Sequence, residues 1–183
     1  VNHPFDYAKQ EQADLAPFRE AVYPADREAI QHWLDGLGLL RPMQTFTLLD
    51  RVNREILGRF FYQMREEPGV QPPARTLAYN SGSCRDFAAL FMEACRHLGL
   101  ASRFVSGYLY TSDTDTGNAS THAWAEVWIE GQGWVRIDPT AAVAPERVEM
   151  SLADLFGDDD PVGGSVIFDG QKIDGEALEQ VAL

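Results

Sequence analysis

A cysteine, a histidine and an aspartate follow one another along the chain in an order that suits nucleophilic catalysis. Cys84 comes directly after the polar turn formed by residues 81–83 and opens an apolar helical stripe, and His122 and Asp138 follow on two strand-like segments. A thiol becomes a strong nucleophile when it loses its proton, and helix N-terminal N–H groups and an imidazolium both stabilise the thiolate. The order therefore predicts Cys84 as nucleophile, His122 as its base and Asp138 as the group that orients the ring.

Each of these residues also has a purely structural interpretation. A free cysteine is often a small core residue, and Cys95, which follows Cys84 on the same predicted helix, is expected to be one. The two thiols would lie about 16 Å apart along that helix, too far for a disulfide. His122 alone fits a hydrogen-bonded histidine, and Asp138 alone, before Pro139, fits a strand-end cap. Only the three residues together favour catalysis.

Composition narrows the classes of protein and of partner. The chain has 183 residues and 45% hydrophobic content, enough for a folded core. A formal net charge of -13 would repel phosphate backbones, so nucleic acid is not an expected partner. No run of about 18 apolar residues occurs and the first residues lack a signal segment, so we expect no membrane segment and a cytoplasmic location.

The apolar pattern predicts an α+β fold in which the helices precede a sheet. Helices are expected at residues 26–37, 47–66 and 84–98. Alternation predicts strands at residues 101–111, 122–129 and 134–138, with a loop at 112–121. Residues 130–133, Glu-Gly-Gln-Gly, are typical of a hairpin loop. Three tryptophans crowd this hairpin, Trp124, Trp128 and Trp134, and we interpret them as a packed aromatic face in preference to a substrate wall.

The hairpin register gives an internal test of the proposed triad. A two-residue loop at Gly131 and Gln132 would set Asp138 opposite Ala125, on the wrong face for His122. A bulge near Trp128, or an equivalent register shift, would set Asp138 opposite Trp124 and diagonal to His122. We therefore predict such a shift. The backbone N–H of Cys84 is the expected first donor to an oxyanion, and the sequence identifies no second donor.

The sequence resembles the transglutaminase-like superfamily, including bacterial members described as cysteine proteases. The resemblance rests on blocks at residues 81–88, 101–108, 122–128 and 133–140, and it covers roughly residues 75 to 145. It implies a papain-like core with the nucleophile helix packed on an antiparallel β-sheet, a Cys-His-Asp triad at Cys84, His122 and Asp138, and no metal or cofactor. It also suggests one domain over residues 1–183: an N-terminal arm and helix (1–43), a core (about 44–145) and an acidic C-terminal extension (146–183).

Three functions compete. The leading hypothesis is a cysteine-dependent amide-bond enzyme that forms a thioester with a peptide or protein substrate, with hydrolysis favoured over acyl transfer to an amine. The first alternative is a catalytically silent domain that binds peptides or assembles with proteins, although such a domain has no need of all three residues. The second is a metal site made by Cys84, His122 and Asp138, although these residues lack the paired spacing of zinc motifs.

Overall fold

The structure is a computed structural model that describes residues 2–39, 42–110, 120–140, 148–151, 166–168 and 171–173. The chain divides into two compact units. The first comprises Val1–Phe104 with Trp124–Ala142, and the second comprises Val105–Ala123 with Val143–Leu183. The expectation of a single domain stays a prediction, and most of the extension expected at 146–183 lies outside the described residues.

The first unit contains the helices and most of the short strands. Its α-helices are α1 (Lys9–Leu15), α2 (Arg27–Gly36), α3 (Thr45–Arg59), α4 (Pro73–Tyr79) and α5 (Cys84–His97). Two 3-10 turns are Ala16–Phe18 and Pro24–Asp26. Its own strands are β1 (Asn2–His3), β2 (Met43–Gln44), β3 (Phe61–Tyr62), β4 (Ser81–Gly82) and β7 (Gly133–Ile137). Strands β5 (Ser102–Tyr110) and β6 (Ser120–Ile129) each run through both units.

The second unit is described more sparsely. The β5 residues from Gly107 to Tyr110 pair antiparallel with β8 (Val148–Ser151). Strands β9 (Val166–Phe168) and β10 (Gln171–Ile173) form a separate antiparallel pair. The loop expected at 112–121 lies outside the described residues apart from its last two positions, which the structure places in β6.

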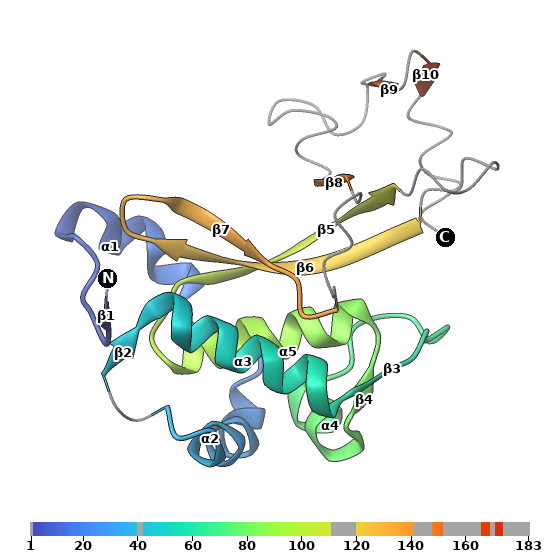
Figure 1. The fold of residues 1–183 in the computed structure, drawn as a ribbon. Coiled ribbons are helices and arrows are strands. Elements are labelled where there is room, and N and C mark those ends of the chain that lie inside the picture. The colour runs from blue at the N-terminus through green and yellow to red at the C-terminus, as the bar shows by residue number, and fades with distance from the viewer. Residues whose placement is uncertain are drawn as a thin grey trace. The chain divides into compact units, whose positions relative to one another are not determined.

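Helices packed on an antiparallel sheet make the protein an α+β fold, as expected. The main sheet has the order β7-β6-β5-β8 (Figure 1). Within the first unit, β6 contributes Ala125, Val127 and Ile129 to a core shared with α3 and α5. These side chains alternate with Trp124, Glu126 and Trp128, because successive strand residues point to opposite faces. One face of the sheet is therefore covered by the helix that begins at Cys84.

Helix α5 follows the pattern expected of it. Ser83 is its N-cap, and Ser83 and Asp86 form a reciprocal capping box. At the other end, Leu98 is the C-cap and Gly99 adopts a φ of 83°, the left-handed conformation that favours glycine there. Its apolar stripe is buried, with Leu90, Phe91 and Ala94 fully enclosed. The cap fixes where the helix starts and therefore where Cys84 lies.

Helix α3 is shorter than the sequence pattern suggested. The stripe of Leu48, Leu49, Val52 and Ile56 is buried as predicted, but the helix ends at Arg59 rather than near residue 66. Phe60 is already extended, with φ -100° and ψ 137°. The next two residues form β3, which pairs in parallel with Ser81 and Gly82 of β4. Our prediction was wrong here because backbone pairing with a distant segment replaced helix propagation.

The β6–β7 hairpin has the register that the sequence required, although it reaches it without a bulge. Ala125 pairs with Ile137 and Ile129 pairs with Gly133. The next pair in this register is Trp124 opposite Asp138. The connecting loop has three residues instead of two: the Gln132 N–H donates to the Ile129 carbonyl at 2.9 Å, and Gly131 has a φ of 78°. The predicted register shift is thus confirmed, and loop length is its cause.

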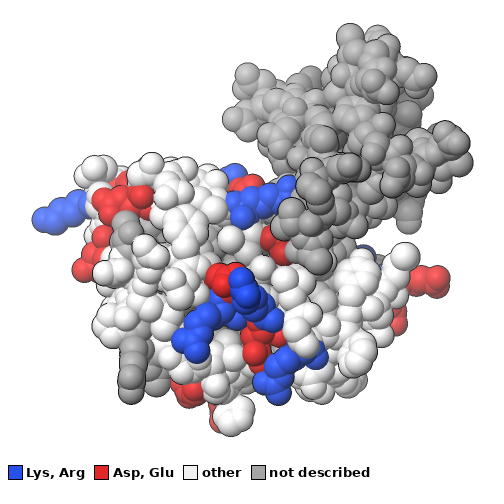
Figure 2. Space-filling view, viewed as in Figure 1, with Lys and Arg blue, Asp and Glu red and all other residues white. Residues whose placement is uncertain are grey.

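Charged side chains of both signs are mixed on the visible face of the first unit. Figure 2 shows basic and acidic groups side by side over α3, where Arg54 pairs with Asp50 and Arg59 with Glu55.

Within the described ranges, every helix is too short or too polar to cross a bilayer.

Candidate active site

Cys84 is the first residue of α5 and is partly exposed to solvent. It forms no disulfide, as expected. The first N–H groups of an α-helix lack intrahelical partners and carry a partial positive charge, which favours an anion at this position. The fold therefore presents a thiol where a thiolate is stabilised and where a substrate can reach it.

A short parallel pair of strands holds the turn in front of Cys84. The Phe61 N–H donates to the Asn80 carbonyl at 2.8 Å, and the Gln63 N–H donates to the Gly82 carbonyl at 2.9 Å. Gly82 has no room for a side chain, because a Cβ there would lie 2.8 Å from the Asp86 Cβ. The turn can approach the helix closely only because this residue is glycine.

Tyr62, on β3, lies beside Cys84. Its hydroxyl interacts with both the side chain and the backbone N–H of Cys84. Its ring packs edge-on against Phe87, with ring centroids 6.3 Å apart. Burial raises the pKa of the Tyr62 hydroxyl, and the charges of Cys84 and Asp138 raise it further. Tyr62 is thus close enough to both Cys84 and Asp138 for their charges to affect the pKa of its hydroxyl.

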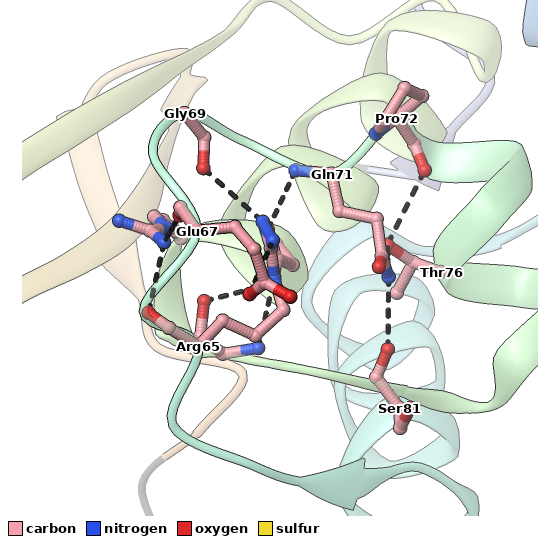
Figure 3. A network of polar contacts seen from close by, with 10 residues as sticks. Arg65, Glu67, Gly69, Gln71, Pro72, Thr76 and Ser81 are labelled. Atoms are coloured by element: carbon pink, nitrogen blue, oxygen red, sulfur yellow. Dashed lines mark hydrogen bonds and ion pairs between the residues drawn. The ribbon is translucent and has the colours of Figure 1, made fainter.

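Figure 3 shows Arg65 and Gln71 in a network of polar contacts beneath the turn. Asp86 is the centre of this network. Its side chain is 0% exposed and receives the Ser83 N–H at 2.8 Å, the Gln71 N–H at 2.8 Å and the Arg65 Nε at 2.7 Å. Burial alone would raise the pKa of this carboxyl, but the hydrogen bonds from Ser83, Gln71 and Arg65 outweigh it and hold the pKa below its ordinary value. The negative charge of Asp86 is thus paired by Arg65.

The network extends to the segment between β3 and α4. The Gln71 side chain donates to Thr76 Oγ1 and to the Ser81 carbonyl, both at 3.0 Å. The Arg85 guanidinium donates to the carbonyls of Arg65 and Glu67. Arg85, which follows Cys84 in sequence, therefore anchors a loop in the first unit.

Asp138 follows β7 and has a fixed carboxylate. Its Oδ1 accepts the Thr140 N–H at 2.9 Å and the Thr140 hydroxyl at 2.6 Å, and its Oδ2 lies 3.5 Å from the Arg136 guanidinium. The strand-end cap considered from sequence is present here. Because these bonds hold Oδ1, they also fix the orientation of the carboxylate.

The tryptophans of the hairpin are packed, in agreement with our interpretation. Trp124 is 2% exposed and lies under the Arg136 guanidinium, 4.1 Å from its ring centroid. Trp128 and Trp134 pack edge to face at 5.5 Å, and Arg103 lies 4.3 Å over Trp134. Arg103 also pairs with Glu126 at 2.7 Å. These contacts stiffen the hairpin that carries Asp138.

His122 is buried at 7% exposure on β6, in the part of the chain assigned to the second unit. Strand alternation puts it on the Trp124 face of β6. Its pairing with Cys84 and Asp138 belongs to the proposal below. Among the described residues, no group of three or more His, Cys, Asp or Glu side chains could hold a metal ion.

Tyr62 is the site residue that our sequence analysis missed. It lay inside the helix predicted for residues 47–66, although it is not part of the apolar stripe of that helix. The run Phe60-Phe61-Tyr62 was the available signal, because consecutive aromatic residues favour a strand over a helix.

A helix that begins at a partly exposed thiol and packs on an antiparallel sheet is the arrangement of a papain-like class of fold. The family model of the transglutaminase-like superfamily matches residues 41–139, more than half of the chain. The protein therefore belongs to the transglutaminase-like superfamily.

Curated relatives match the same region. A protein-glutamine gamma-glutamyltransferase of Pseudomonas aeruginosa is 36% identical over 85 residues, which are 43% of this chain and 13% of that protein. An uncharacterised protein of Mycobacterium tuberculosis is 42% identical over 73 residues, which are 35% of this chain and 23% of that protein. The chain thus matches less than a quarter of the length of either relative.

Solved structures share the fold. A protein from Cytophaga hutchinsonii, proposed to be a cysteine protease, aligns with a TM-score of 0.62 at 22% identity, covering 81% of this chain and 50% of that one. The periplasmic domain of TgpA from Pseudomonas aeruginosa, bound to ethylmercury, aligns with a TM-score of 0.52 at 27% identity, covering 66% of this chain and 46% of that one. The expected α+β, papain-like architecture is confirmed.

Proposed function

We propose that this protein is a cysteine-dependent amide-bond enzyme that acts through Cys84, His122 and Asp138 and a thioester intermediate. The observation that carries the proposal is the place of Cys84: a partly exposed thiol at the capped N-terminus of α5, in a chain that belongs to the transglutaminase-like superfamily. The substrate class is a peptide or protein that presents a carboxamide or peptide bond.

In the proposed reaction, the Cys84 thiolate attacks the carbonyl carbon and forms a C–S bond, while the π electrons move to the oxygen. The resulting oxyanion accepts the Cys84 backbone N–H. Collapse of this intermediate breaks the C–N bond, and the leaving amine takes a proton from the His122 imidazolium. Water then attacks the thioester while His122 accepts its proton, and collapse of the second intermediate releases the acid and regenerates the Cys84 thiolate.

Asp138 is proposed to orient His122 and to stabilise the imidazolium. The hairpin register supports this role. Continued by one residue beyond the Ala125–Ile137 pair, it sets Asp138 opposite Trp124 and therefore diagonal to His122. The bonds from Thr140 to Oδ1 support it too, because they fix the orientation of the carboxylate.

Water is the proposed acceptor of the acyl group. Cys84 is partly exposed, so water reaches the thioester unless something else covers it. The names of the relatives point both ways, to a glutamyltransferase and to a proposed protease.

The cytoplasmic location expected from the sequence stays a prediction. The TgpA neighbour is a periplasmic domain.

A burst experiment tests the proposal. With p-nitrophenyl acetate, the wild-type protein should release one equivalent of p-nitrophenolate rapidly, and peptide mass spectrometry should find the acetyl group on Cys84. Cys84→Ser and His122→Ala should lose the burst, and Cys95→Ala should keep it. A wild-type protein without a burst, or with acetyl on Cys95 alone, would point instead to a silent binding domain.

The acceptor is tested in the same reaction. Adding a primary amine such as glycine methyl ester should leave acetate as the main product if water is the acceptor. Acetyl-glycine methyl ester as the main product at millimolar amine would instead identify an acyltransferase.

A further inference from the structure

The proposed reaction leaves one chemical need unmet. The tetrahedral intermediate carries a full negative charge on oxygen, and enzymes of acyl transfer hold that charge with two or more aligned donors. The Cys84 backbone N–H supplies one. A second donor has to lie within hydrogen-bond distance of the same point, beside the sulfur.

Tyr62 is placed at that point by the backbone. It pairs with Gly82, two residues before the nucleophile, and the hydrogen bonds of its neighbours Phe61 and Gln63 to β4 fix the strand. The edge-on contact with Phe87, on the first turn of α5, limits where the ring can turn. The position of the hydroxyl therefore follows from the same turn that positions Cys84.

The Tyr62 hydroxyl interacts with the groups that an oxyanion would use. Both the backbone N–H and the side chain of Cys84 interact with the hydroxyl oxygen of Tyr62. An oxyanion bound to the same N–H would occupy the space next to this oxygen. We propose that the Tyr62 hydroxyl is the second oxyanion donor, turning its O–H toward the substrate oxygen when that oxygen takes over the Cys84 N–H. This inference rests on the proposed function.

Two properties suit Tyr62 to this role. The residue is 56% exposed, so its solvent side gives the ring room for the small shift that admits a carbonyl oxygen. Burial of the hydroxyl end, and then the charges of Cys84 and Asp138, raise the pKa of Tyr62. The phenol therefore keeps its proton at neutral pH and remains a donor beside a thiolate.

The same contacts fit one competing role, in which Tyr62 covers the thiol and has to be displaced before any reaction. The two roles predict opposite signs. Removing a donor slows acylation, whereas removing a cover speeds it. A reagent that reacts with the thiolate without forming an oxyanion separates them, because alkylation by iodoacetamide has no tetrahedral intermediate.

Tyr62→Phe is the test variant, since it keeps the ring and its contact with Phe87. Tyr79→Phe is the matched control, because Tyr79 is similarly exposed at 60% and lies on α4 with Arg75 over its ring. The acylation rate with p-nitrophenyl acetate and the plateau rate of iodoacetamide alkylation at high pH are measured for both variants and for wild type.

For Tyr62→Phe we expect acylation to fall about 10²–10³-fold while plateau alkylation stays within about threefold of wild type. Tyr79→Phe should match wild type in both. Faster or unchanged acylation in Tyr62→Phe would overturn the proposal, as would an equal fall in acylation and alkylation, which would limit Tyr62 to supporting the thiolate. Failure of the proposed function itself would be seen separately, as wild-type protein without acylation.

Discussion

Helix α5 carries two thiols in opposite surroundings. Cys84, at its first residue, is partly exposed and interacts with the Tyr62 hydroxyl. Cys95, in its interior, is 0% exposed and lies in the main core. Burial raises the pKa of the Cys95 thiol, and the lowering effect of Arg96 does not compensate. The same side chain on the same helix is thus a candidate nucleophile at one place and an apolar filler at the other.

The difference comes from what each end of the helix is built from. The N-terminal turn is polar, with Ser83, Asp86 and Arg65 joined in one buried network. The interior is apolar, and Leu90, Phe91 and Ala94 are fully enclosed. We therefore expect the turn that precedes the helix to set the reactivity of Cys84. Changes at this turn should affect Cys84 and leave the surroundings of Cys95 intact.

The largest expected effect is on turnover. Cys84→Ser should lower kcat/KM by about 10⁴–10⁶-fold, because it removes the attacking atom. Cys95→Ala should keep kcat/KM within about threefold and lose about 1–2 kcal/mol of stability, since it leaves a small cavity. Steady-state assays and urea unfolding measure both. Similar losses of kcat/KM in the two variants would contradict the different roles assigned to Cys84 and Cys95.

Alkylation should separate the two thiols almost as widely. In native protein near pH 6, iodoacetamide should label Cys84 at least about 10³-fold faster than Cys95, because Cys95 is reached only by unfolding, which costs about 5 kcal/mol or more. Peptide mass spectrometry against time gives the two rates. Urea should raise the Cys95 rate along the unfolding curve; labelling of Cys95 at the Cys84 rate in buffer would contradict its burial.

The buried ion pair beneath the turn at residues 81–83 should contribute more to the free energy of unfolding than an exposed pair. Asp86→Ala should cost about 3–5 kcal/mol, because it leaves Arg65 and the Ser83 and Gln71 N–H groups without their acceptor. Asp50→Ala is the control, since the Asp50–Arg54 pair is exposed and should contribute less than about 1 kcal/mol. Equal costs in urea unfolding would contradict the ranking.

A methyl group at Gly82 should disturb Cys84 by a different route. Gly82→Ala should cost about 1–3 kcal/mol and slow Cys84 alkylation, because the new Cβ meets Asp86 Cβ at 2.8 Å and Phe87 Cε1 at 3.2 Å. At Gly36, the last residue of α2, a Cβ meets nothing within 4 Å. Gly36→Ala should therefore gain about 0.4–1 kcal/mol and leave alkylation unchanged. If Gly82→Ala were instead more stable than Gly36→Ala, the turn before Cys84 would be able to relax around the added Cβ.

The smallest expected effect is the pH dependence of Asp86. Its folded pKa lies below the ordinary value of 3.8, so its stabilisation is present above that value and is lost as pH falls through the folded pKa. One such group changes the unfolding free energy by at most about 1.4 kcal/mol per pH unit. Urea unfolding between about pH 5 and about pH 2 should show a steeper loss of stability for wild type than for Asp86→Asn. Parallel curves would exclude Asp86 as the source.

Local patterns in the sequence account for most of what positions Cys84. The polar turn, the apolar stripe and Gly99 predict α5 almost to the residue, because each signal acts within one or two helical turns. The fold class also followed from helical periodicity and strand alternation. The hairpin register did not follow from loop composition, which indicated a two-residue loop. We predicted the shift because Asp138 has to reach His122, and the structure produces it through a three-residue loop rather than a bulge.

Interactions between distant segments account for what was missed. The pairing of Phe61 and Tyr62 with β4 depends on residues about twenty positions away, and no local pattern contains it. Helix α4 was missed as well, although Pro73 in its first turn is a known start signal. The network around Asp86 joins Arg65, Gln71 and Ser83 only once both segments are in place.

The N-terminal arm sets a lower limit on how far this protein can be trimmed. The Glu93 carboxylate, 2% exposed on α5, accepts the N–H groups of Val22 and Tyr23, and Arg96 donates to the Glu20 carbonyl. Deleting the chain through Tyr23 would leave an anion and a cation without these partners on helix α5. A minimal folded fragment therefore has to keep this stretch, or replace both side chains with apolar ones.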